Sequence, residues 1–268
     1  MKISGVMPLR NAVKLWYPFE LAIRSLRPIC DEVVVLVDPT SEDDSLARVR
    51  ALAGEFRDFT VIESVWNMDN HKGFGESEIA KQTSIVCEAA GGDWIFSLQA
   101  DEVLHEAEAE STRAACTTAD ADGVSALSLS RLYFYGGLTT YRDNWTVPCL
   151  RLFRRGKWVP DRFSGGMQFV PVSDAERSRL ITSRIFHYSR VGDPAIVARR
   201  VRNLDTFYHE PAKVKAEEDI APYTFDQLRK LDTYVEEHVT EADDDAKLCP
   251  FPLEGHPRAA IAHFEATP

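Results

Sequence analysis

The stretch that decides the fold reads Gly92-Asp93-Trp94-Ile95-Phe96-Ser97-Leu98-Gln99-Ala100-Asp101-Glu102. Its apolar and aromatic residues predict a buried β-strand over residues 93–100. Two carboxylates, Asp101 and Glu102, follow this strand directly. Hard carboxylate oxygens suit Mg²⁺ or Mn²⁺, and these ions can bridge to the phosphates of a substrate. The two carboxylates therefore indicate a metal site at the end of a strand or, equally well by themselves, a solvent-exposed turn.

Strands and helices alternate on the N-terminal side of this stretch. Apolar runs predict strands over 3–7, 32–37 and 60–64, and amphipathic runs predict helices over 18–27, 44–56 and 78–90. The glycines Gly91 and Gly92 stand in the usual position of a C-terminal helix cap. The alternation predicts an α/β fold with an open, mostly parallel sheet and helices on both faces.

The pattern changes after residue 120. Short aromatic and β-branched runs predict mixed or antiparallel strands that extend the sheet over 124–135, 147–153, 158–159 and 184–188. The chain is mainly helical in pattern from Asp193 onward. We therefore expect a core over residues 1–190 and a helical C-terminal extension over residues 191–268 that packs on it.

Composition narrows the class of protein. The 268 residues include 31 Lys and Arg against 42 Asp and Glu, which gives a formal net charge of −11. Such an acidic chain lacks the basic surface that a nucleic-acid backbone requires. The five cysteines are widely spaced without a CxxC pair, and no apolar run approaches the roughly 18 residues of a membrane span. We expect a cytoplasmic protein.

Polar residues follow three of the predicted strands. Arg10 and Asn11 follow the first strand, Asp38 follows the second, and Gln99 and Asp101 end the fourth. Ligands of open α/β sheets bind outside the carboxyl ends of the strands. These residues are therefore the candidates for a binding site.

The segment 92–102 resembles the GDW-(apolar)-L-DADE segment of family 2 glycosyltransferases with the GT-A (nucleotide-diphospho-sugar transferase) fold. Other segments resemble this family in the same order: 4–11 its first strand and RN turn, 33–38 its second strand with the Asp that meets the base, and 80–82 its A-R-N helix start. Segments 150–154, 185–188 and 254–257 resemble a bacterial subgroup with R-(I/L)-F-R, a late HY and a terminal GTHP motif.

The resemblance implies a hexosyltransferase that moves a sugar from a UDP- or GDP-type donor to an acceptor hydroxyl, usually with inversion and with Mn²⁺ or Mg²⁺. The bacterial subgroup implies a carbohydrate or glycolipid acceptor in cell-surface polysaccharide or lipopolysaccharide synthesis. Such an acceptor would bring the protein near a membrane. The departing diphosphate needs its charge neutralised, and the acceptor hydroxyl needs a base.

The same resemblance assigns roles to individual residues. Asp101 matches the metal-binding Asp of the DxD pattern, and His187 would complete the metal site or contact the diphosphate. Gln99 stands where the family has the preceding Asp; it can hydrogen-bond a ribose but adds no charge. Glu102 either assists the metal site or is a solvated structural residue.

Further roles complete the predicted site. Arg10, Asn11 and Asp38 would bind the nucleotide, and Lys72 would offer charge to a phosphate above a helix N-terminus. Asp161, between the sheet extension and a glycine turn, is the candidate catalytic base, with Asp143 as the alternative.

Two rival functions stay open. A protein of this fold that binds nucleotides without turnover is supported by Gln99. A sugar-phosphate nucleotidyltransferase is disfavoured because residues 7–11 lack a glycine-rich loop. Arg151 and Arg154 alternate along one predicted strand in a way that suits phosphate-facing and solvent-facing positions equally.

Overall fold

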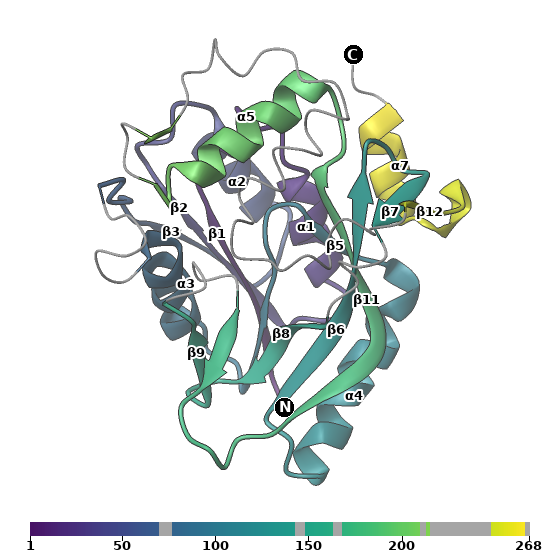
Figure 1. The fold of residues 1–268 in the computed structure, drawn as a ribbon. Helices are drawn as coiled ribbons and strands as arrows, with labels where there is room; N and C mark the ends of the chain where they lie inside the picture. Colours follow the sequence, from purple (N-terminus) through teal and green to yellow (C-terminus); the bar gives the residue numbers. More distant parts are fainter. Residues whose placement is uncertain (70–76, 143–147, 163–167, 210–212, 215–247, 266–268) are drawn as a thin grey trace.

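The computed structural model describes residues 1–69, 77–142, 148–162, 168–209, 213–214 and 248–265 (Figure 1). Its N-terminal half is the predicted parallel sheet. The strands are β1 (Ile3–Leu9), β2 (Glu32–Val37), β3 (Phe59–Glu63) and β4 (Trp94–Ser97), in the spatial order β3-β2-β1-β4. The helices between them are α1 (Phe19–Leu26), α2 (Ser45–Ala53) and α3 (Glu78–Ala89). The predicted α/β class is confirmed, and β4 is shorter than the predicted strand 93–100.

The second half of the sheet is mostly antiparallel, as the short aromatic runs predict. Strand β8 (Pro148–Arg154) pairs antiparallel with β4, and β6 (Ala126–Tyr135) pairs antiparallel with β8. The long strand β11 (Ser178–Arg190) runs parallel to β6, and β5 (Glu102–Leu104) pairs antiparallel with β11. The short strands β7 (Thr140–Arg142) and β12 (Leu248–Pro250) extend the sheet beyond β6, and β9 (Trp158–Pro160) and β10 (Phe169–Pro171) form a separate pair.

The helix α4 (Ala109–Ala121) follows β5 and packs on β11 and β6, and it was not predicted. Its buried positions are small or polar: Ala109, Thr112, Cys116 and Ala119. A stripe of this kind gives almost no hydrophobic periodicity, so the sequence pattern does not reveal the helix.

The sheet is buried on both faces, which explains the continuous apolar run of β2. Val33, Val35 and Val37 belong to one core cluster together with buried residues of α1, α2 and α4. Val34 and Leu36 point to the opposite face and belong to a second cluster with Val86 of α3. Successive side chains of a strand alternate between faces, so a strand covered on both sides must be apolar throughout.

The prediction that Gly91 and Gly92 form the C-terminal cap of α3 is wrong. The helix ends at Ala89, its C-cap residue Ala90 has an extended backbone, and neither glycine has a positive φ. A Cβ on Gly92 would lie 2.8 Å from the backbone nitrogen of Ser4 and against its hydroxyl. Gly92 is therefore required by the close approach of the chain to β1 and not by a left-handed turn.

In its described residues, the C-terminal segment contributes the helices α5 (Pro194–Asp205) and α7 (Arg258–Glu265) and the sheet strand β12. Asp193 caps α5 by accepting from the backbone nitrogen of Ala195, and Pro194 occupies its first turn. Figure 1 shows α5 at the edge of the sheet where the parallel strands end. The division into a core over 1–190 and an extension over 191–268 stays a prediction. Among the described residues, no helix has the length and apolarity to cross a bilayer.

Candidate functional site

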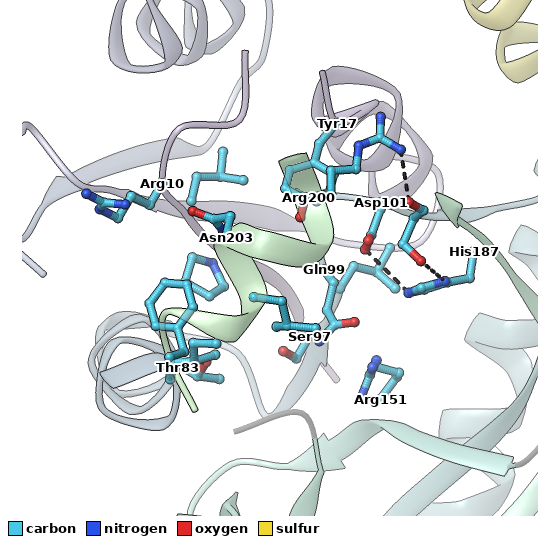
Figure 2. Close-up of a pocket in the computed structure, with 18 of the residues that line it drawn as sticks. Arg10, Tyr17, Thr83, Ser97, Gln99, Asp101, Arg151, His187, Arg200 and Asn203 are labelled. Carbon is cyan, nitrogen blue, oxygen red and sulfur yellow. Dashed lines mark hydrogen bonds and ion pairs between the residues drawn. The ribbon is translucent and has the colours of Figure 1, made fainter. Parts of the chain in front are cut away.

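A cavity of about 330 Å³ lies at the carboxyl edge of the parallel strands, beneath α5. This volume is in the range of small-molecule sites. Residues after β1 and β4 form its floor, and residues of α5 cover it. Figure 2 shows Arg10 and His187 at opposite ends of the cavity, with Gln99 between them. The polar lining consists of Arg10, Tyr17, Thr83, Ser97, Gln99, Asp101, Arg131, Tyr133, Arg151, His187, Ser189, Arg190, Arg200 and Asn203.

Asp101 and His187 face each other in this cavity, although they are 86 positions apart in the sequence (187 − 101). The Oδ1 atom of Asp101 lies 3.6 Å from Nε2 of His187, and both side chains are largely buried (Figure 2). Strand β11 brings them together, because His187 pairs with Glu102 of β5 and Tyr188 donates its backbone N–H to the carbonyl of Asp101 at 2.9 Å. The predicted pairing of Asp101 with His187 is thus present in the geometry.

The hydrogen bonds around His187 allow the tautomer that a metal ligand at Nε2 requires. Nδ1 lies 3.2 Å from the hydroxyl of Ser189, which itself donates to the hydroxyl of Tyr133 at 2.8 Å. The Ser189 oxygen can therefore accept the Nδ1 proton, and Nε2 then presents its lone pair to Asp101. Tyr133 also stacks on the imidazole at a centroid distance of 4.4 Å, which fixes the ring plane.

Both groups have shifted acid–base properties. Burial, and after it the neighbouring charge of Glu102, raises the pKa of Asp101 to about 6. Burial, and after it the positive charge of four arginines, holds the pKa of His187 well below its usual range. These arginines are Arg131, Arg190, Arg151 and Arg200. The imidazole is therefore neutral at pH 7, as a metal ligand must be.

The residues present fit a divalent cation. A carboxylate oxygen of Asp101 and the lone pair of His187 Nε2 face one another at a separation too long for a hydrogen bond. Mg²⁺ is commonly held by one or two protein ligands together with substrate phosphates and water. No cluster of three or more His, Cys, Asp or Glu suited to a metal occurs in the described part of the chain. The protein would therefore supply two ligands, and phosphate and water would supply the others.

Arg151 and Glu102 form a buried ion pair beside this site. Arg151 Nε donates to Glu102 Oε2 and its Nη2 donates to Oε1, both at 2.8 Å, and Glu102 has no exposed surface. The pair holds the pKa of Glu102 below its usual range despite burial. Glu102 also accepts the backbone N–H of Gln99 at 3.1 Å. Glu102 is therefore the buried partner of an arginine, and the alternative of a solvated residue is wrong.

The position of Arg151 results from a β-bulge. In the pairing of β8 with β6, Leu152 is opposite Leu127 and Leu150 is opposite Ser128, so Arg151 has no partner residue on β6. A bulge redirects a side chain out of the regular alternation. Arg151 consequently lies in the cavity lining at 2% exposure, whereas Arg154 of the same strand is 40% exposed. The solvent-facing alternative for Arg151 is wrong.

Arg200 of α5 is fully buried and joins the cover of the cavity to its walls. Its Nη1 donates to the carbonyls of Tyr188, Ser189 and Val191 at 3.0–3.1 Å, and its Nε donates to the carbonyl of Leu15 at 2.7 Å. A guanidinium satisfied by backbone carbonyls keeps its charge inside the protein without a carboxylate partner in direct contact. Arg200 therefore fixes α5 over the cavity and contributes positive charge there.

The cavity has an apolar side opposite these charges. Trp66, Ile79, Phe169, Leu204 and Phe207 line it. The rings of Trp66 and Phe207 meet edge to face at 5.8 Å. The indole Nε1 of Trp66 is buried without a hydrogen-bond partner among the described residues. Apolar walls with a few polar groups are typical of sites for organic ligands.

The other predicted site residues are placed differently. Arg10 lines the cavity and pairs with Asp38, whose Oδ2 lies 3.0 Å from its Nε. Asp38 has no exposed surface, and its second oxygen accepts from Thr40 at 2.9 Å and 2.7 Å. Asn11, with a φ of 50°, accepts the backbone N–H of Glu42 at 2.8 Å. Asn11 and Asp38 thus shape the loop beneath Arg10, and neither lines the cavity.

Three further predictions concern loops. Asp161 follows β9, is half-buried, and does not line the cavity. Lys72, Asp143 and residues 163–167 lie outside the described part of the chain. The roles predicted for Asp161 and Lys72 stay predictions.

Several cavity residues were missed by sequence reasoning. Arg131 and Tyr133 lie two positions apart on β6 and therefore share a face, and Tyr133 pairs with His187. Trp66 follows β3, and Asn203 lies on α5. The only available signal was the strand-end rule, which would have drawn attention to the segment after β3.

Among the comparisons with known proteins, only those with solved structures found similar proteins. No family model matches the chain, and no curated protein sequence matches it. The solved structure of S. aureus TarS in complex with UDP is 16% identical, with a TM-score of 0.46 over 82% of this chain and 69% of that one. TarS in complex with UDP-GlcNAc is 17% identical, with a TM-score of 0.45 over 82% of this chain and 70% of that one.

A third similar structure is glucosyl-3-phosphoglycerate synthase from Mycobacterium tuberculosis in complex with Mn²⁺, UDP and glucosyl-3-phosphoglycerate. It is 15% identical to this chain, with a TM-score of 0.42 over 78% of this chain and 81% of that one. All three TM-scores lie below 0.5. The chain's own structure defines an α/β protein with a ligand cavity at the carboxyl edge of its parallel strands.

Proposed function

We propose that the chain is a GT-A-type glycosyltransferase that transfers a hexosyl group from a UDP- or GDP-sugar to an acceptor hydroxyl. The observation that carries the proposal is the pair Asp101 and His187, which face each other at 3.6 Å in a cavity at the carboxyl edge of the parallel strands. This is the edge at which α/β folds bind nucleotides. The family resemblance of residues 92–102 and 185–188 supports the same assignment.

The residues divide the chemical work of such a transfer. Asp101 and His187 would hold Mn²⁺ or Mg²⁺, which would supply positive charge to the departing nucleoside diphosphate. Gln99, between the ends of the cavity, offers an amide to a ribose hydroxyl (Figure 2). Arg10 offers a guanidinium oriented by Asp38. The arginines around His187 hold the anionic leaving group in an environment shielded from water.

Inversion requires a base on the acceptor side of the sugar, and Asp161 is proposed for that role. Its place after β9 puts it beside the 163–167 segment. Lys72 is proposed to contact a phosphate. The acceptor is proposed to be a carbohydrate or glycolipid in cell-surface polysaccharide synthesis, reached from the cytoplasm near a membrane.

A second function is favoured by one specific observation. Gln99 lines the cavity where the resembling family has an Asp, so the protein has one acidic ligand fewer for a metal. A nucleotide-binding protein without turnover would combine this change with an intact cavity. It would bind nucleoside diphosphates and transfer no sugar.

Thermal unfolding against UDP, GDP and their sugars, each with Mn²⁺, Mg²⁺ or EDTA, tests the proposal. A ligand at about a hundred times its dissociation constant adds roughly 2.7 kcal/mol to the free energy of unfolding. We expect one nucleotide to raise the unfolding midpoint most strongly with Mn²⁺ or Mg²⁺. Asp101→Asn should remove the metal-dependent part, while Asp174→Asn, at an exposed turn, should retain it.

Product analysis separates the two functions. A glycosyltransferase transfers the sugar of its donor slowly to water or faster to an acceptor, and either reaction releases nucleoside diphosphate. Asp101→Asn should abolish that release. Binding of the nucleotide without release of diphosphate from any sugar donor favours the non-catalytic protein. Absence of any nucleotide-dependent shift would reject both.

A further inference from the structure

The cavity is strongly positive although the chain is acidic. Among the described residues, five arginines and one carboxylate, Asp101, line it, and the buried carboxylates Asp38 and Glu102 pair with two of these arginines. The chain as a whole carries a net charge of −11. The arginines are Arg10, Arg131, Arg151, Arg190 and Arg200. Concentrated positive charge inside an acidic protein favours an anionic ligand.

Three of these guanidinium groups are engaged with the protein itself. Arg10 pairs with Asp38, and Arg151 forms a two-point ion pair with Glu102. Arg200 donates to backbone carbonyls of β11 and of the loop after β1. These three arginines are held in position by existing bonds, and a ligand would have to share their donors.

Arg131 differs in its bonding. Its Nε is buried and has no hydrogen-bond partner among the residues that the structure describes. Its Nη1 lies 4.0 Å from Glu102 Oε1, an oxygen that already accepts from Arg151. The guanidinium carbon lies 5.6 Å from the centre of the Tyr133 ring, which also stacks on His187. The side chain is 18% exposed and lines the cavity, and no hydrogen bond ties its guanidinium to the described residues, so this group is available to an anion that enters the cavity.

The neutral side chain of Gln99 strengthens this interpretation. An acidic residue at position 99 would have offset one of the arginines, and its absence leaves the cavity with excess positive charge. A diphosphate carries several negative charges and presents oxygens that match the planar donors of a guanidinium. The excess charge and the unused donor therefore point to the same chemical group.

We propose that the guanidinium of Arg131 binds the diphosphate of the nucleotide, and that the cavity consequently retains nucleoside diphosphates in the absence of a divalent metal. The identity of the ligand as a nucleoside diphosphate rests on the function proposed above. The arginine contact itself rests on the cavity and on the unpartnered donor. The inference assigns part of the charge neutralisation to a residue of β6, separate from Asp101 and His187.

Substitution of Arg131 should disturb the fold less than substitution of Arg151. Replacing Arg131 leaves Glu102 with both of its bonds to Arg151. Calorimetric titration with UDP, GDP and pyrophosphate in EDTA is compared for the wild type, Arg131→Gln, Arg131→Lys and the control Arg57→Gln. Arg57 is exposed and does not line the cavity, so its replacement removes the same charge elsewhere.

We expect a nucleoside diphosphate to bind the wild type and Arg57→Gln in EDTA with similar affinity. Arg131→Gln should weaken this binding by about ten-fold or more, which is the scale of one charged hydrogen bond. Arg131→Lys keeps the charge but loses the planar fork, so its affinity should lie between the two. Unfolding midpoints without ligand check that the variants fold; if Arg131→Gln does not, an unchanged affinity of Arg131→Lys would overturn the proposal.

The outcomes separate this inference from the proposed function. Binding in Mn²⁺ but not in EDTA overturns the inference and leaves the proposed function standing. Binding in EDTA that Arg131→Gln does not weaken also overturns the assignment to Arg131. Binding of pyrophosphate alone, lost in Arg131→Gln, supports the anion site and contradicts the proposed function.

Discussion

The two halves of the sheet differ in what they bury. The parallel half, β1 to β4, buries apolar side chains on both faces, and Val33 to Val37 are all 4% exposed or less. The second half buries charge as well: Glu102 on β5, Arg151 on β8 and His187 on β11 have exposures of 0%, 2% and 5%. The parallel half therefore forms the floor of the cavity, and the second half supplies most of its ionisable groups.

The cost of burial explains why these groups occur as a connected set. A buried ion without a partner is expensive, and a well-bonded partner offsets that cost. Glu102 is held by Arg151, and His187 is held by Ser189 and Tyr133. In this half of the sheet, a substitution at the site therefore also changes the free energy of unfolding, whereas the strands of the parallel half bury mainly apolar side chains.

The largest effect is expected from Arg151→Met. The substitution leaves the carboxylate of Glu102 buried without its two 2.8 Å bonds. Loss of one partner of a buried ion pair costs about 3–5 kcal/mol. Chemical denaturation at pH 7 measures this change in the free energy of unfolding.

Arg154→Met is the matched control on the same strand. Arg154 is 40% exposed and pairs with Asp120 on the surface, so its loss should cost about 1 kcal/mol or less. The double variant Glu102→Met/Arg151→Met should recover most of the stability because no unpaired charge is left. Equal losses for Arg151→Met and Arg154→Met would contradict the importance of the buried Arg151–Glu102 pair for this half of the sheet.

The fold was predictable where the chain follows simple periodicities. The predicted strand 32–37 coincides with β2, and the helix predicted over 78–90 ends one residue beyond α3. The hydrophobic patterns of these two segments were sufficient to predict both elements. Helix α4 was not predicted because small residues form its buried face. Gly92 was wrongly predicted to cap a helix because its close contact with Ser4 leaves no signal in the local sequence.

The site was predictable at the ends of strands and not within them. Asp101 and Gln99 directly follow β4, and both line the cavity. Arg131 lies in the middle of β6, where an arginine usually indicates an exposed position. Arg151 enters the cavity through a bulge, and a bulge depends on pairing between strands that are distant in sequence.

The next effect concerns the pH dependence of stability at Asp101. Its pKa is about 6 in the folded protein against an ordinary 3.8, so the folded state binds the proton more tightly than the unfolded state does. The stabilising contribution of this group is full below pH about 4 and is lost as the pH rises to about 6. Two pKa units correspond to about 3 kcal/mol. Asparagine does not titrate, so the free energy of unfolding of Asp101→Asn should rise relative to that of the wild type by about this amount between pH 4 and pH 7.

Urea denaturation in EDTA at several pH values measures that difference. His187 has the opposite dependence, because its lowered pKa makes the folded state lose stability as the pH falls below about 6.5. Because His187 lies 3.6 Å from Asp101, the same comparison in a His187→Gln background removes this contribution. A difference that stays constant, or that shrinks as the pH rises, would refute the raised pKa of Asp101. Asp174→Asn, which is exposed, should show no such pH-dependent difference.

The smallest expected effect is the difference in stability between alanine substitutions at two glycines, one in each half of the sheet. Gly92 precedes β4, and a Cβ there would meet the backbone of Ser4 at 2.8 Å, so Gly92→Ala should cost about 2 kcal/mol by forcing β1 and β4 apart. Gly137, between β6 and β7, has no heavy atom within 4 Å of such a Cβ and no positive φ. Gly137→Ala should therefore change the free energy of unfolding by less than about 1 kcal/mol, with the sign toward stability because alanine restricts the unfolded chain. Thermal or urea unfolding of both variants measures the pair. An unchanged free energy of unfolding in Gly92→Ala would mean that β1 and the chain before β4 can move apart at little cost. The stability of the parallel half would then come from its apolar faces and not from this close contact.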